Sequence, residues 1–143
     1  MPAMDSSTRA LLSRRRSWRG LAACAIAWPL LVAASTPAEQ LAAYSAAAQR
    51  PAQPQQGEAF FGAKHGREWA CASCHDSPPT RAGQHRATGK TIAALAPAAE
   101  PTRFSDPAKT EKWFRRNCND VLGRECSAGE KADVLAWLMG LRP

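Results

Sequence analysis

The sequence predicts an all-α domain that follows an N-terminal export signal, and three observations carry this prediction. Capping boxes stand at residues 36–39 and 127–130, and Asp106-Pro107 is a third helix start. No segment after residue 34 alternates apolar and polar residues as a half-buried strand does. With 143 residues, of which 45% are hydrophobic, the chain is long enough for one domain with a real core.

Residues 1–34 are predicted to be a secretory signal peptide, which leaves residues 35–143 as the mature domain. Five arginines and only one acidic residue, Asp5, lie within the first 20 positions. The apolar run 21–34 is too short to span a bilayer and suits the hydrophobic region of a signal peptide. We expect cleavage after Ala34 and a periplasmic location, with an uncleaved N-terminal anchor as the alternative.

The charge of the mature domain excludes nucleic acid as a partner. The whole chain has a net charge of +7, but five of its 19 basic residues and one of its 12 acidic residues precede residue 35. The remaining charge of about +3 favours steering toward an acidic partner protein. We expect no membrane span in the mature domain.

The expected elements follow from local patterns along the chain. Thr36, Pro37 and Glu39 begin a helix that runs to Gln49, and residues 50–56 form a polar connection. A short helix begins at Gly57 and leads to the cysteine motif. Residues 76–103 lack periodicity and are predicted to form a long loop.

Two further helices complete the prediction. Residues 107–122 form a helix that Asp106 caps and Gly123 ends. The last helix covers 128–141, and its apolar stripe consists of Val134, Leu135, Trp137, Leu138 and Leu141.

The segment 71–75 (CASCH) is the C-x-x-C-H motif to which c-type haem is attached. The thiols of Cys71 and Cys74, one helical turn apart, can form thioethers with the two vinyl groups of a porphyrin. The adjacent His75 can then ligate the iron. We therefore expect one covalently attached haem c.

The alternatives for these cysteines are a zinc site and a thioredoxin-like redox pair. A zinc site would combine them with Cys118 and Cys126, but a zinc ribbon uses a second closely spaced cysteine pair. A thioredoxin-like redox pair needs a βαβ context that the sequence lacks. In an oxidising compartment, the spacing of Cys118 and Cys126 instead favours a disulfide, with two reduced thiols as the alternative.

No methionine after residue 34 is well placed to be the sixth iron ligand. Met139 is the sole methionine after residue 34, and it points away from the apolar stripe of its helix. His65 and His85 lie in polar surroundings, where a solvated loop residue is the more common role. Asn117 instead falls on the apolar face, about 40° from Trp113. From this pattern alone, the amide is better explained by bonds to backbone groups near the helix end, and a distal haem role stays open.

The chain resembles the sphaeroides haem protein (SHP) family. The resemblance rests on residues 88–90, 96–97, 103–104, 111–126 (EKWFRRNCNDVLGREC) and 130–133. It implies a class I cytochrome c-like fold, His75 as proximal ligand, Asn117 as the axial asparagine and a Cys118–Cys126 disulfide. It also implies that Asn117 leaves the iron on reduction and that the open site binds oxygen or nitric oxide. The implied redox partners are a dihaem cytochrome c and a membrane cytochrome b.

The sequence therefore predicts a gas-binding, electron-accepting c-type cytochrome, with oxygenase-type turnover left open. The alternative is a conventional electron-transfer cytochrome whose sixth ligand is His85 or His65. A zinc-stabilised interaction module is the third hypothesis.

Overall fold

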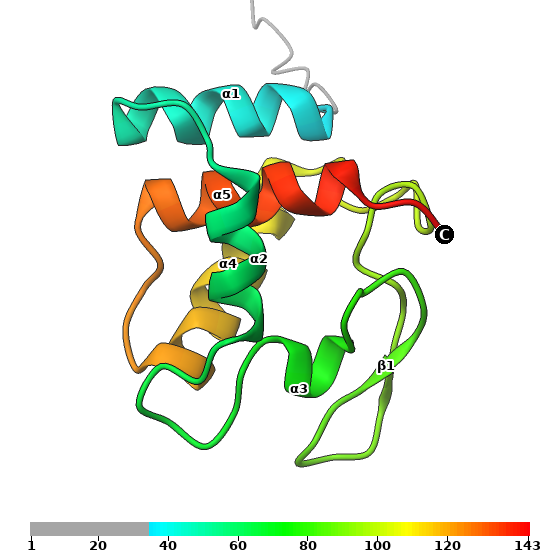
Figure 1. Cartoon of the computed structure of the whole chain (residues 1–143). Coiled ribbons are helices and arrows are strands. Elements are labelled where there is room, and N and C mark those ends of the chain that lie inside the picture. Colours follow the sequence, from blue (N-terminus) through cyan, green and yellow to red (C-terminus); the bar gives the residue numbers. More distant parts are fainter. Residues whose placement is uncertain (1–34) are drawn as a thin grey trace, which may run out of the picture. The chain divides into compact units, whose positions relative to one another are not determined.

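The computed structural model describes residues 35–143, so the predicted signal peptide lies outside the described residues. Five helices and one short hairpin follow in the order α1 (Pro37–Ala48), α2 (Pro54–Gly62), α3 (Ala72–His75), β1 (Gly83–Gln84), β2 (Thr91–Ile92), α4 (Pro107–Leu122) and α5 (Ala128–Gly140). Figure 1 shows α1 lying alongside α5, with α2 crossing α5 and leading down to α3.

The predicted helix starts are confirmed at atomic detail. The Thr36 hydroxyl accepts from Glu39 N, and the Glu39 carboxylate accepts from Thr36 N. Ser127 and Glu130 form the same reciprocal pair at the start of α5. Asp106 caps α4, and Gly123 ends it with φ at 74°, a left-handed conformation that glycine adopts without strain.

Two expectations differ from the structure. Helix α2 begins at Pro54, because proline fits the first helical position and Gln53 precedes it as the N-cap. The expected loop 76–103 contains the antiparallel pair β1–β2, in which Gly83 faces Ile92 and Gln84 faces Thr91. Strands of two residues are too short to show alternation in the sequence.

The core forms where α2 crosses α5. Phe61, Val134, Trp137 and Leu138 form a buried cluster that confirms the predicted stripe of the last helix. A Cβ atom on Gly57 would lie 2.0 Å from Asp133 O, so only glycine permits this close approach of α2 to α5. Cys71 and Ala72 pack against the same cluster, which seats the cysteine motif on the core.

Candidate haem site

The C-x-x-C-H motif forms a single helical turn. His75 N donates to Cys71 O over 3.1 Å, and Ser73 Oγ accepts from Ala70 N over 3.0 Å. Cys71 and Cys74 are both free thiols and both half-buried. Residues three apart on a helix lie on the same side, so the two thiols face one neighbouring group together.

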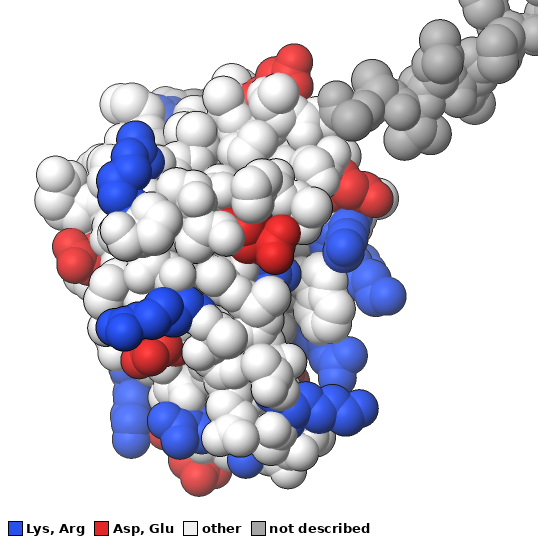
Figure 2. Space-filling model, turned by 90° about the vertical axis from the view of Figure 1, so that its right-hand side faces the viewer, with Lys and Arg blue, Asp and Glu red and all other residues white. Residues whose placement is uncertain are grey.

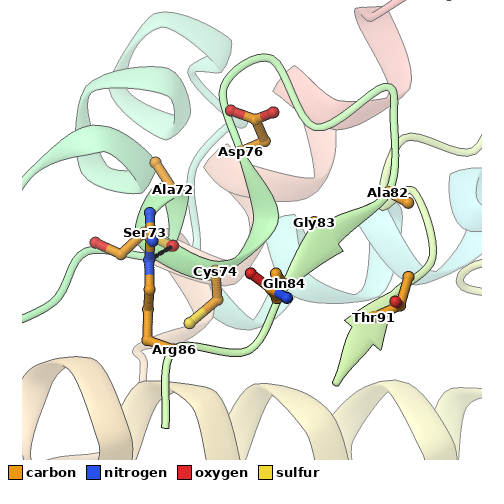
Figure 3. A pocket seen from close by; sticks show the side chains of 9 residues that line it. All are labelled: Ala72, Ser73, Cys74, Asp76, Ala82, Gly83, Gln84, Arg86 and Thr91. Carbon is orange, nitrogen blue, oxygen red and sulfur yellow. Dashed lines mark hydrogen bonds between the residues drawn. The ribbon is translucent and has the colours of Figure 1, made fainter. Parts of the chain in front are cut away.

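The hairpin β1–β2 lies directly against this turn. A Cβ atom on Gly83 would lie 2.1 Å from Cys74 O, and Arg86 Nε donates to Ser73 O. Between the turn and the hairpin is a pocket of about 450 Å³, which Cys74, Gln84, Arg86 and Thr91 help to line (Figure 3). The second thiol of the motif therefore borders open space.

His75 is held in the neutral form that a metal ligand requires. Burial, followed by the nearby charges of Arg103 and His85, lowers the pKa of His75 to about 4. The ring packs 6.2 Å from the Phe61 ring, centroid to centroid. Its Nδ1 is buried and has no hydrogen-bond partner among residues 35–143. Two free thiols beside a neutral imidazole fit a covalently attached haem.

The structure disfavours the two other functions of the motif. Burial raises the pKa of Cys71 to about 11, whereas a redox-active C-x-x-C pair depends on a lowered thiol pKa. Cys118 and Cys126 are joined to each other, so neither thiol is available for zinc. Within the described part of the chain, no three His, Cys, Asp or Glu side chains gather as a metal site.

The predicted disulfide Cys118–Cys126 is confirmed. The two sulfur atoms are 2.00 Å apart, and both residues are buried. The bond joins the last turns of α4 to the segment before α5, and Asn117 immediately precedes the first cysteine.

Asn117 lies at the margin of the buried face of α4. Thr110, Cys118 and Val121 are the buried residues of this helix, and Asn117, half-buried, lies about 20° from Thr110 around the axis. Trp113, the reference residue for these angles, has a side chain that is 42% exposed. Phe114 turns inward instead and packs beside Phe104 and Tyr44.

The amide of Asn117 does not hydrogen-bond to the backbone of its own helix. Among residues 35–143 its side chain makes no hydrogen bond; the asparagine that bonds backbone is Asn119, whose Nδ2 donates to Arg115 O. The structural explanation favoured by the sequence pattern alone, a bond to backbone near the helix end, is therefore absent for Asn117. Its amide is free to meet another group.

The other candidate ligands have local roles. His65 Nε2 lies 2.8 Å from Phe60 O, and the His65 and Phe60 rings pack at a tilt of 39° with centroids 4.4 Å apart. His85 Nδ1 accepts from Thr88 N over 3.3 Å within the hairpin turn, where His85 is half-buried. Met139 is half-buried, next to the fully buried Leu138.

Sequence reasoning missed the cluster that attaches α4 to the rest of the domain. Tyr44 OH donates to Glu111 Oε1 over 2.6 Å, and Lys131 Nζ lies 2.7 Å from Glu111 Oε2. The Lys131 ammonium also stands over the rings of Tyr44 and Phe114. These residues come from α1, α4 and α5, so no local pattern could have indicated that they meet.

None of the described helices has both the length and the apolar composition needed to cross a membrane.

The chain matches one protein family and is similar to known cytochromes. Residues 47–138 match a family described as a domain of unknown function, DUF1924. The chain is 51% identical over 118 residues to cytochrome c-type protein SHP of Cereibacter sphaeroides, covering 79% of this chain and 90% of that protein.

Two solved structures are similar to it. One is oxidised SHP, described as an oxygen-binding cytochrome c, with a TM-score of 0.71 and 49% identity over 76% of this chain and 99% of the other. The second is oxidised cytochrome c'' from Methylophilus methylotrophus, with a TM-score of 0.68 and 34% identity over 75% of this chain and 95% of the other. The predicted fold is confirmed by these matches.

Proposed function

Because the chain belongs to the DUF1924 family and to the SHP-like c-type cytochromes, we propose that it is a monohaem electron acceptor that binds a diatomic gas when reduced. Residues 1–34 would serve as the export signal, and residues 35–143 would form the haem domain in the periplasm. Cys71 and Cys74 would hold the haem through thioethers, and His75 would be the proximal ligand. The haem supplies one-electron chemistry and an affinity for diatomic gases.

The sixth ligand in this proposal is Asn117, and a single observation carries it. The amide stands at the edge of the buried face of α4 and has no hydrogen-bond partner among residues 35–143. Both polar atoms of this amide keep some exposure, so the amide is accessible to another group. Its oxygen is a hard, weak donor, which suits ferric iron and holds ferrous iron poorly.

Release of Asn117 can take place without unfolding of α4. The disulfide at Cys118 holds the helix one residue away, and the Glu111 cluster holds it before that point. Rotation of the side chain alone would withdraw the oxygen. The NH2 group of the same amide could then donate a hydrogen bond to a gas molecule on the distal side.

Electrons would arrive from a redox partner protein. Most Lys and Arg side chains on the face drawn in Figure 2 lie in its lower half and along its right edge, so the domain offers basic surface to an acidic partner. SHP, the relative described as oxygen-binding, suggests oxygen as the gas. The family resemblance adds nitric oxide as the alternative. The resemblance suggests a dihaem cytochrome c and a membrane cytochrome b as partners.

Visible spectra of the mature holoprotein test the proposal. The oxidised and reduced forms are recorded with and without carbon monoxide. The proposal expects a ferrous form that is high-spin, five-coordinate and shifted by carbon monoxide. A ferrous form that stays low-spin and does not respond would identify the protein as a conventional electron carrier with a strong sixth ligand.

A further inference from the structure

An exposed tryptophan stands among cations on the outer side of α4. The Trp113 side chain is 42% exposed. Among the described residues, it is the one large hydrophobic side chain that is exposed. Lys112 Nζ lies 6.0 Å from the centroid of its ring, and Arg116 Cζ lies 5.6 Å from it. These distances are those of cation–π contacts, which hold the three side chains as one patch.

The cations on the outer side of α4 outnumber the acidic residues there, where Asp120, four residues after Arg116, is an exposed carboxylate. Lys109, Lys112, Arg115 and Arg116 are all exposed, and none takes part in an ion pair within residues 35–143. Glu111, an acidic residue of the same helix, is instead bonded to Lys131 and Tyr44. The outer side of α4 therefore presents a concentrated positive charge to solvent.

The position of Trp113 around the helix relates this charge to the haem site. At about 100° per residue, Trp113 lies about 40° from Asn117 on one side and about 40° from Lys109 on the other. Trp113 is thus the border between the face that carries Asn117 and the basic side of α4. A partner bound at Trp113 would therefore lie about one helical turn from Asn117.

We propose that Trp113, Lys112 and Arg116 form the centre of a docking surface for an acidic one-electron donor protein. Tryptophan and arginine are the residue types that most often dominate binding energy at protein interfaces. The surrounding lysines and arginines would attract an acidic partner and speed its encounter. A second copy of this chain is a poor occupant, because it would bring the same positive charge to the contact.

The inference rests on the proposed function, in which the domain is an electron acceptor. In the docked complex the donor would lose one electron, and a haem held by Cys71, Cys74 and His75 would take it up, so the electrons balance. No other reactant is required.

Stopped-flow reduction of the ferric holoprotein tests the surface. The donor used as a probe is the hydroquinone of an acidic flavodoxin, and a neutral small donor, lumiflavin semiquinone, reports the intrinsic reactivity of the haem. Arg116→Glu is compared with Arg142→Glu, which makes the same charge change at the exposed C-terminus, where Arg142 bonds only to nearby carbonyls. Trp113→Ala is compared with Trp113→Phe, which keeps an aromatic ring.

We expect Arg116→Glu to slow reduction by flavodoxin about tenfold at low ionic strength and to flatten its salt dependence, because steering depends on local charge. Arg142→Glu should change the rate by less than about twofold. Trp113→Ala should slow reduction by flavodoxin about fivefold without slowing reduction by lumiflavin. Trp113→Phe should recover most of the rate of reduction by flavodoxin.

Two outcomes would overturn the proposal. Equal effects of Arg116→Glu and Arg142→Glu would mean that only net charge matters. Equal slowing of flavodoxin and lumiflavin by Trp113→Ala would place Trp113 at the haem rather than in docking. Both outcomes are distinct from failure of the gas-binding proposal, which is measured by carbon monoxide spectra alone.

Discussion

Lys131 Nζ lies 2.7 Å from Glu111 Oε2, and this ion pair joins α5 to the first half of α4. The disulfide of Cys118 joins the last turns of the same helix to the segment before α5. Asn117 therefore lies on a helix that is attached on both sides of it. A ligand on such a helix can leave by rotation of its own side chain while the backbone stays in place.

Replacement of Glu111 by glutamine should loosen the first of these attachments. Tyr44 can still donate to the amide oxygen, but the ion pair with Lys131 is lost, and we expect a loss of about 1 kcal/mol in unfolding free energy because the pair is partly exposed. Urea unfolding at pH 7 measures the change. Glu125→Gln, at an exposed site without an ion pair in the described residues, is the control. Equal losses in the two variants would argue against the cluster.

The disulfide should make a larger contribution. Closure of a loop of this length lowers the entropy of the unfolded chain, which corresponds to about 2.5 kcal/mol in the chain-entropy model. We expect Cys118→Ala with Cys126→Ala to lose a stability of that order in urea unfolding, plus the cost of the removed sulfur atoms. Mass spectrometry of a non-reduced digest should show the two peptides linked, and alkylation of both without prior reduction would rule the bridge out.

Acid should destabilise the domain through Glu130. The hydrogen bonds from Arg124, followed by that from Ser127 N, lower the pKa of Glu130 to about 2. A carboxyl with a lowered pKa stabilises the fold above its unfolded pKa of about 4.3, and this stability is lost as pH falls toward 2. Because Arg124 and Glu130 are both partly exposed, solvent screens this pair, and Glu130→Gln should cost about 1 kcal/mol at pH 7 and progressively less as the pH falls through 2. A constant difference over this pH range would contradict the assignment.

Covalent attachment should depend on both thiols of the motif. Mature protein made with a c-type maturation system should keep its colour after acid–acetone extraction, because thioethers survive this treatment. Cys71→Ala with Cys74→Ala should release all haem under the same conditions. Haem that extracts freely from the unchanged protein would disprove the attachment.

The helices were predictable because residues close together in the sequence determine where each helix begins and ends. Asp106, Pro107 and Gly123 fix both ends of α4 locally, and the structure reproduces residues 107–122. The hairpin was not predictable, because its two-residue strands depend on the contact of Gly83 with Cys74 O. Such close approaches are tertiary and leave no periodic pattern in the sequence.

The site was predicted unevenly for a similar reason. Cys71, Cys74 and His75 are adjacent in the chain, so their spacing alone indicates their chemistry. The helical wheel gave angles on α4 relative to Trp113, whereas Thr110, Cys118 and Val121 mark the centre of the buried face. The wheel could not determine this centre, because the side that faces the core is decided by partners such as Phe104 and Tyr44.

The sixth ligand decides the function, and Asn117→Val tests it. Valine is close to asparagine in size but has no donor or acceptor, so the fold of α4 should be kept while the amide oxygen is lost. We expect the ferric spectrum to change to a five-coordinate or water-bound form, because a weak ligand has been removed. Carbon monoxide should still bind the ferrous protein, whereas oxygen should dissociate faster because the amide NH2 no longer donates to it.

His85→Ala is the matched comparison for this prediction. His85 is half-buried, as are the candidates His65 and Met139, and its Nδ1 accepts from Thr88 N in the hairpin turn. If Asn117 is the ligand, His85→Ala should leave the ferric spectrum unchanged and affect only the hairpin. If His85→Ala changes that spectrum and Asn117→Val does not, the iron is held by two histidines. The protein would then be an electron carrier, because a strong imidazole ligand leaves no position for a gas when the iron is reduced.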